Sequence, residues 1–254
     1  MPGQSYTKYL PYGFPGSMGQ QGPWGVEVFP NAATLAINFG MPVFALNETA
    51  ANGMGVTGAQ GVAIAGATGL MPTAANFKGV AEAHVQQANS YNPQSMGNYL
   101  QYAPVPVVDL GGPVVQVYNS AVNPPVKDGP VYVRIANPAA GEIVGGFEAL
   151  NDTTTYTPTI TTQTTSSANI TLAAVTNLAV GMTVIGTGIP ASAIITAINA
   201  TTGVITISAA ATTTASSGTL TIGGNTLLIT NATWGSGSDA SGVALLILKV
   251  RNNS

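Results

Sequence analysis

The chain has 254 residues, and only 6% of them are charged, against about 25% in ordinary soluble domains. Its surface must therefore be built largely from Thr, Ser, Asn, Gln and backbone groups. The net charge of -3 without a basic cluster argues against nucleic-acid binding, and the absence of cysteine excludes disulfides, thiolate catalysis and zinc–thiolate sites. No apolar run is long enough to cross a membrane, and the first residues lack the apolar region of a secretory signal.

Glycine and proline are abundant, with 31 and 17 residues, while strong helix formers are scarce. Long helices therefore have little material to form from, and we predict an all-β fold.

Residues 1–30 are rich in Pro, Gly and aromatic residues but show no apolar periodicity. We predict an extended N-terminal arm without strands, which packs on its own body or on a neighbouring subunit. A disordered terminus is the alternative. On composition, the side chains expected to make capsid or inter-subunit contacts are Tyr6, Tyr9, Tyr12, Phe14 and Trp24.

Short apolar pieces alternate with turn signals from residue 36 onward, which predicts short strands joined by tight turns. Asn52-Gly53 is a good two-residue hairpin turn. Residues 114–118 and 131–135 read as strands, and the second should bury Val131 and Val133 while Tyr132 and Arg134 face the other side. Residues 77–89 fit a helix or a strand, and we favour a strand.

The composition changes after Asp152, because residues 153–238 contain no charged side chain and are rich in Thr. Alternation at 204–208 and 219–222 indicates strands with outward Thr, a residue that suits a half-buried sheet. We therefore expect three units: the arm at 1–30, a discontinuous β-sandwich body at 31–155 and 225–254, and an inserted β domain at 156–224, here called the insert. The stretch "VGMTVIGTGIP" at 180–190 should be an edge strand and turn of the insert.

No residue pattern indicates catalysis, a cofactor or a metal. The sequence "GMGVTG" at 53–58 satisfies G-x-G-x-x-G, but no helix can start after it, so a hairpin loop is the better interpretation. His84 is the only histidine, and no Ser lies in a nucleophile elbow that could use it. The carboxylates never take the spacing of a calcium loop, and Lys127-Asp128-Gly129 reads as a turn.

Five stretches carry a resemblance to a known family. They are "GFPGSMGQ" at 13–20, "INFGMPVF" at 37–44, "FKGVAEA" at 77–83, "VYVRIANPAAGEIVGGFEAL" at 131–150 and "ITNATWGSGSDASGVALLILKV" at 229–250. In this order they resemble the structural cement, or head-decoration, proteins of tailed bacteriophages. Residues 178–212 look like a small, Ig-like β module that is inserted in assorted phage virion proteins.

The resemblance implies a jelly-roll-like β-sandwich that forms a homotrimer on the outer capsid surface and stabilises joints between major capsid proteins. It implies no enzyme activity, no cofactor and no partnership with nucleic acid or membrane. The arm would reach across neighbouring subunits. An alternative is a virion surface protein whose insert binds a host carbohydrate or receptor through its exposed Thr and Asn side chains.

Overall fold

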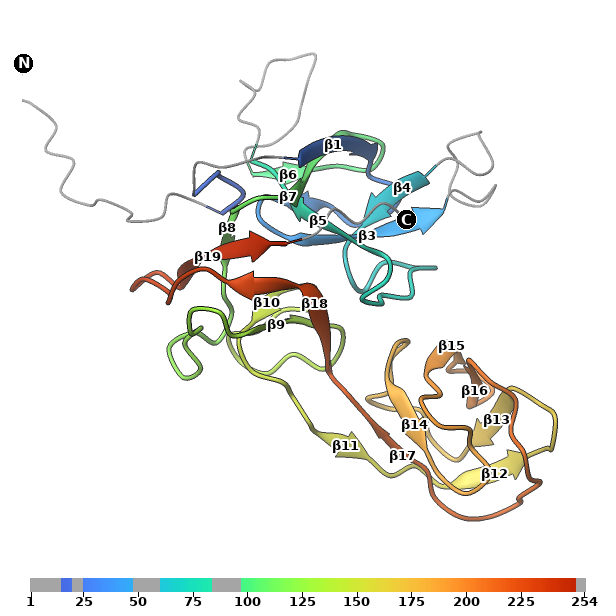
Figure 1. The fold of residues 1–254 in the computed structure, drawn as a ribbon. Coiled ribbons are helices and arrows are strands. Elements are labelled where there is room, and N and C mark those ends of the chain that lie inside the picture. The colour runs from blue at the N-terminus through green and yellow to red at the C-terminus, as the bar shows by residue number, and fades with distance from the viewer. Residues whose placement is uncertain (1–14, 20–24, 48–59, 84–96, 250–254) are drawn as a thin grey trace, which may run out of the picture.

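The computed structural model describes residues 15–19, 25–47, 60–83 and 97–249, and every regular element in these ranges is a β-strand (Figure 1). This confirms the all-β prediction. No helix in this part of the chain is long and apolar enough to cross a membrane.

Two five-stranded antiparallel sheets form the body of the molecule (Figure 1). The first has the order β1 (Gly25–Pro30), β7 (Pro104–Leu110), β5 (Phe77–Ala81), β3 (Pro42–Asn47), β4 (Gln60–Ala63). The second has the order β10 (Phe147–Glu148), β9 (Pro130–Arg134), β18 (Thr226–Trp234), β19 (Val243–Leu248), β8 (Val114–Gln116). A two-stranded sheet of β2 (Ile37–Asn38) and β6 (Asn98–Tyr99) flanks the first.

One hydrophobic core joins the two large sheets and continues into the insert. Phe44 and Phe77 of the first sheet meet edge to face with ring centroids 5.7 Å apart, and Phe147 and Trp234 of the second do so at 6.4 Å. Such pairs add stabilisation beyond their buried area. The opposite face of the first sheet is also buried, in a smaller cluster that includes Tyr99. Both faces of the first sheet are therefore buried: one packs against the second sheet, and the other lies in the smaller cluster with Tyr99 of β6.

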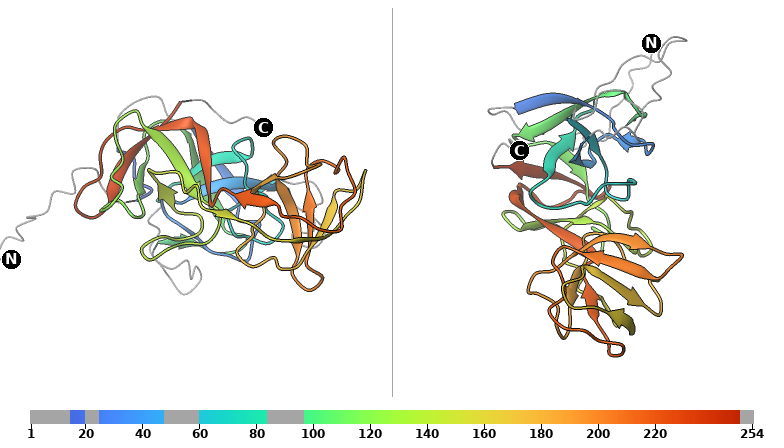
Figure 2. Two further views of the ribbon diagram at one scale, coloured as in Figure 1. Left: turned by 90° about the horizontal axis from the view of Figure 1, so that it is seen from below. Right: turned by 90° about the vertical axis from the view of Figure 1, so that its right-hand side faces the viewer.

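The insert forms two smaller sheets whose strands pair only with one another (Figures 1 and 2). One has the order β11 (Thr155–Tyr156), β17 (Thr221–Gly223), β14 (Thr183–Ile185). The other has the order β12 (Ile160–Gln163), β13 (Asn169–Leu172), β16 (Val204–Ile207), β15 (Ile195–Asn199).

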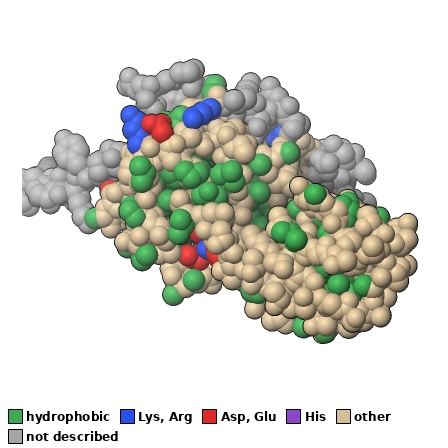
Figure 3. All heavy atoms as spheres, turned by 60° about the horizontal axis from the view of Figure 1, so that its bottom comes forward, with side chains coloured by type: hydrophobic (Ala, Val, Ile, Leu, Met, Phe, Trp, Pro, Cys, Tyr) green, Lys and Arg blue, Asp and Glu red, His purple; other side chains and the backbone are tan. Residues whose placement is uncertain are grey.

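The alternation predicted for the insert is confirmed. Ile205 and Ile207 are buried, as are Leu220 and Ile222, while Thr219 and Thr221 are exposed. Hydroxyl groups thus keep the outer face hydrated without charge. The space-filling view shows this lobe almost free of charged side chains (Figure 3). The strand and turn expected at 180–190 are present, with β14 at one end of its sheet order.

Three predicted strands of the body appear with adjusted limits. Of residues 77–89, the structure describes 77–83 and shows a strand at Phe77–Ala81. Residues 114–118 form a strand at Val114–Gln116, and β9 begins one residue early at Pro130. The hairpin turn at Asn52-Gly53 lies outside the described residues, although β3 and β4 pair antiparallel with Asn47 opposite Gln60. The turn at Lys127 and Asp128 is confirmed.

Two expectations were wrong. The arm was predicted to contain no strand, but Gly25–Pro30 forms β1, an end strand of the first sheet that pairs with β7. The sequence pattern of this strand is weak. Its two valines, Val26 and Val28, are 41% and 62% exposed, so its apolar residues do not mark the buried face. Arg134 points away from Val133 as predicted, but it is buried at 2% exposure because carboxylates cover it.

Candidate functional site: the arm root and the base of the insert

Residues 15–19 are hydrogen-bonded on one side to β8 of the second sheet and on the other to Ala83, just after β5 of the first sheet. The Gly16 amide donates to the Val114 carbonyl at 2.7 Å, and the Val114 amide donates to the Ser17 carbonyl at 2.8 Å. On the other side, the Ala83 amide donates to the Gly16 carbonyl at 2.9 Å. We call residues 15–19, with Gly40 and Ala83, the arm root. It fastens the chain to the body directly after residues 1–14.

Two glycines make the arm root possible. Gly16 and Gly40 have φ angles of +84° and +76°, a conformation that favours glycine. A Cβ atom on Gly16 would lie 2.7 Å from the Ala83 amide nitrogen, and one on Gly40 would lie 2.7 Å from Cβ of Pro15. No side chain fits between these backbones.

Four of the five quoted motifs therefore converge in space. Gly16 belongs to the motif at 13–20, Gly40 to the one at 37–44 and Ala83 to the one at 77–83. A Cβ atom on Gly19 would lie 2.7 Å from Cδ1 of Leu245, which belongs to the motif at 229–250. Nothing in the spacing of these motifs along the sequence shows that they meet.

The contact residues predicted from composition are not described. Tyr6, Tyr9, Tyr12, Phe14 and Trp24 all lie outside the described residues, as does His84. Their role stays a prediction, whereas residues 15–19, between Phe14 and Trp24, are described.

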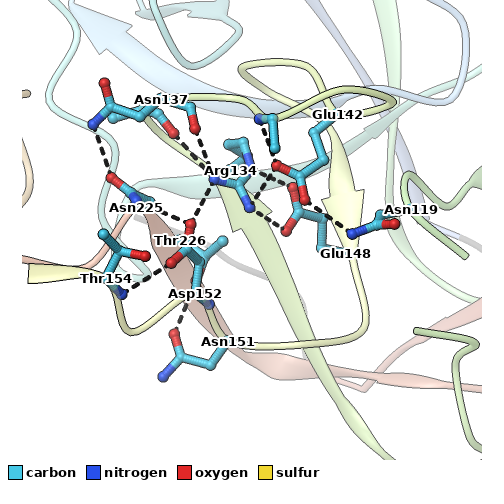
Figure 4. Close-up of polar contacts among 12 residues, drawn as sticks. Asn119, Arg134, Asn137, Glu142, Glu148, Asn151, Asp152, Thr154, Asn225 and Thr226 are labelled. Carbon is cyan, nitrogen blue, oxygen red and sulfur yellow. Dashed lines mark hydrogen bonds and ion pairs between the residues drawn. The ribbon is translucent and has the colours of Figure 1, made fainter. Parts of the chain in front are cut away.

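A second polar site surrounds Arg134 at the end of β9 (Figure 4). Its Nε donates to Oε1 of Glu148, and its Nη2 donates to Oε2 of Glu148 at 2.9 Å, which makes a bidentate pair. Nη2 also lies 2.9 Å from Oε2 of Glu142, and Nη1 donates to Oδ2 of Asp152 at 2.9 Å. One buried guanidinium thus joins three carboxylates from three parts of the chain, which we call the charge cluster.

The charge cluster lies where the chain enters and leaves the insert (Figure 4). Asn225 donates to Oδ2 of Asp152 at 2.9 Å, and the Asp152 amide donates to the hydroxyl of Thr226 at 3.0 Å. Asn137 donates to Oδ1 of Asn225 at 2.9 Å and to the carbonyl of Asn177, inside the insert, at 2.7 Å. These bonds tie both ends of the insert to the body.

Burial and hydrogen bonding shift the pKa values of the carboxylates in opposite directions. Burial raises the pKa of Glu148 above its usual value, although its bonds to Arg134 oppose this. Burial also acts to raise the pKa of Asp152, but bonds from Thr154, Asn225 and Arg134 outweigh it and hold that pKa well below its usual range. Every member is engaged by another protein group, so the cluster supports structure rather than chemistry.

A groove of about 400 Å³ separates the outer face of the second sheet from the insert. Tyr132 and Leu228 line it from the body, and Thr183, Ile185 and Thr221 line it from the insert. Within the described residues, no group of three His, Asp or Glu side chains could hold a metal ion. The groove offers apolar surface and hydroxyl groups, and Asn151 and Asp152 also line it.

Comparison with known families gives one clear match. The model of the family described as "Structural cement protein (E217 gp24/Pam3 gp6)" matches residues 2–185. The match includes four of the five motifs, and the stretch at 229–250 lies beyond it. No curated protein matches the chain. Since the matched range exceeds half of the chain, the protein belongs to the phage structural cement family, whose members are non-enzymatic proteins that bind capsid proteins on the virion surface.

Proposed function

We propose that this chain binds the outer surface of a phage capsid as a homotrimer and stabilises the joints between major capsid proteins. The observation that carries the proposal is the arm root. It holds residues 15–19 in a fixed place on the body, and we infer that the Pro- and aromatic-rich residues 1–14 attached there contact neighbouring subunits. A fixed base lowers the entropy lost when such a segment binds.

Cement action needs no chemistry. A protein that binds the assembled shell better than its free subunits stabilises the shell by mass action. A specific interface of about 1,600 Å² is ordinary for a stable complex, and repetition over a trimer raises the effective concentration of each contact.

We propose that the chain is divided into three structural units. Residues 31–155 and 225–254 form the cement body, a β-sandwich of jelly-roll type, and residues 1–30 hold the arm, with β1 as its last part. Residues 156–224 form an inserted, Ig-like β domain. This assignment is supported by the closed pairing of the insert's strands and by its separate lobe (Figures 1 and 2).

The proposal is tested with phage heads that lack this protein. The full chain should sediment with them and raise the temperature at which they release DNA. A variant without residues 1–14 keeps the arm root, so it should unfold at nearly the parent temperature yet bind heads at least tenfold more weakly. Equal binding by the two proteins would refute the role of the arm, and no binding by the parent would refute the cement role itself.

A second function is favoured by the groove beside the insert. Tyr132 offers an aromatic ring, and Thr183 and Thr221 offer hydroxyl groups, which suits a host carbohydrate or receptor. A glycan array probed with the full chain and with a Tyr132→Ala variant tests this. Binding that depends on Tyr132 supports the receptor function, and an array without signal removes it.

A further inference from the structure

The loop between β8 and β9 exposes two valines. Val122 is 74% exposed and Val126 is 70% exposed, more than any other large apolar side chain among the described residues. We call residues 119–129 the valine loop. Ala121 and Pro124 are exposed beside them, so the tip of the loop is apolar. Its only charges, Lys127 and Asp128, cancel, so this surface suits an apolar partner rather than an anionic one.

The valine loop is held in shape by its own bonds. The Asn123 amide donates to the Asn119 carbonyl at 2.9 Å, and the Gly129 amide donates to the Val126 carbonyl at 2.8 Å. Asn119 donates from its side chain to Glu142 of the charge cluster at 3.1 Å. An apolar surface on a fixed loop loses little conformational entropy on binding.

The body secures the far end of the loop as well. The Asp128 amide donates to the carbonyl of Trp234 at 2.7 Å, and Pro125 is buried beneath the exposed residues. The two valines are therefore exposed on a loop whose conformation is fixed by hydrogen bonds to the body.

The valine loop and the arm root lie along the same strand pair. Leu245 of β19 pairs with Val114 of β8, next to the arm root, and Val243 pairs with Gln116 where β8 leads into the loop. The views agree that this end of the body lies away from the insert (Figures 1 and 2). The arm root and the most exposed apolar side chains thus share one end of the molecule.

We propose that the valine loop is a capsid-contacting surface, with Val122 and Val126 seated in apolar depressions of the major capsid protein. This rests on the proposed function, which supplies the capsid as partner. Apolar anchors in the middle of an interface commonly carry a large part of its binding energy. The insert would then project away from the shell.

The test compares two full-length variants on heads that lack this protein. Val122→Ser with Val126→Ser removes both anchors, and Leu150→Ser, at a side chain that is 56% exposed and lies outside the groove lining, is the matched control. We expect the double variant to bind heads about tenfold or more weakly and the control to bind like the parent. Thermal unfolding should be nearly unchanged in both variants, since exposed substitutions have small effects on stability.

Three outcomes would overturn the inference while leaving the cement role intact. Parental binding by the double variant would show that the loop does not touch the capsid. Loss of the trimer in light scattering would assign the loop to contacts between copies of the chain. Equal weakening by Leu150→Ser would show that the loss is not specific to the valine loop. If the parent itself fails to bind, the proposed function fails first.

Discussion

Gly16 and Gly40 meet backbone to backbone. A Cβ atom on Gly16 would lie 2.9 Å from the Gly40 nitrogen, and one on Gly40 would lie 2.8 Å from the Gly16 nitrogen. The two glycines are far apart in the sequence and become neighbours because the turn between β2 and β3 packs against residues 15–19. The arm root depends on this contact.

Replacing Gly40 with Ala should therefore destabilise the fold. A left-handed conformation costs a side chain about 1–2 kcal/mol, and the close backbone contact should add about 1–3 kcal/mol more. Gly69 is the matched control, because its φ is +80° and an added Cβ would meet nothing within 4 Å. Urea unfolding measures both variants. Equal losses for Gly40→Ala and Gly69→Ala would show that the close contact does not matter.

Replacing Arg134 with Met should leave three carboxylates without their cation. Breaking a buried pair on one side typically costs about 3–5 kcal/mol, and we expect a loss of this size in the free energy of unfolding at neutral pH. Lys249→Met removes an exposed cation and should change stability by less than about 0.5 kcal/mol. If the two variants unfolded at the same urea concentration, the charge cluster would not hold the body together.

The stability of the parent should fall in acid through Asp152. A carboxyl group whose pKa is lower in the folded state contributes stability above its unfolded pKa of about 3.9, and this contribution is lost as the pH falls toward the folded pKa. Glu148 has the opposite sign, because its folded pKa is raised, so its ionisation opposes folding at higher pH.

An Asp152→Asn variant separates these effects. It should be less stable than the parent at pH 7, and the difference should shrink as the pH is lowered from about 5 to about 2. Unfolding in urea across this range measures the slope. A difference that stays constant with pH would show that the charge on Asp152 is not the stabilising feature.

The insert should be removable without loss of the body. Thr155 pairs with Gly223 across β11 and β17, so the two chain ends lie side by side and a short Gly linker can replace residues 156–222. Loop-closure entropy changes slowly with length, so this exchange is inexpensive. We expect trimerisation and head binding to persist, measured by light scattering and sedimentation. Loss of both would show that the insert belongs to the core of the protein.

The strands with clean alternation could be predicted from the sequence. In β16 the buried Ile205 and Ile207 alternate with Val204 and Thr206, and in β17 the buried Ile222 follows the exposed Thr221, so local pattern and tertiary environment agree. In β1 they disagree, because a strand at the end of a sheet exposes Val26 and Val28 and its apolar residues no longer mark a buried face.

The two polar sites could be predicted only in part. Arg134 was placed on the correct side of β9, but its burial depends on Glu142, Glu148 and Asp152, which reach it from separate segments. The arm root depends on contacts between residues 16, 40 and 83. A glycine in a sequence motif does not show which distant backbone segment it will contact. Long-range contacts of this kind leave no local pattern.

The central claim is that the chain decorates a phage head from outside, and a cryo-electron microscopy map of the particle tests it most directly. The account predicts trimeric density on the outer head surface over joints between major capsid proteins, with the valine loop toward the shell and the insert pointing away. A complete map whose outer surface carries no density for this chain would contradict it.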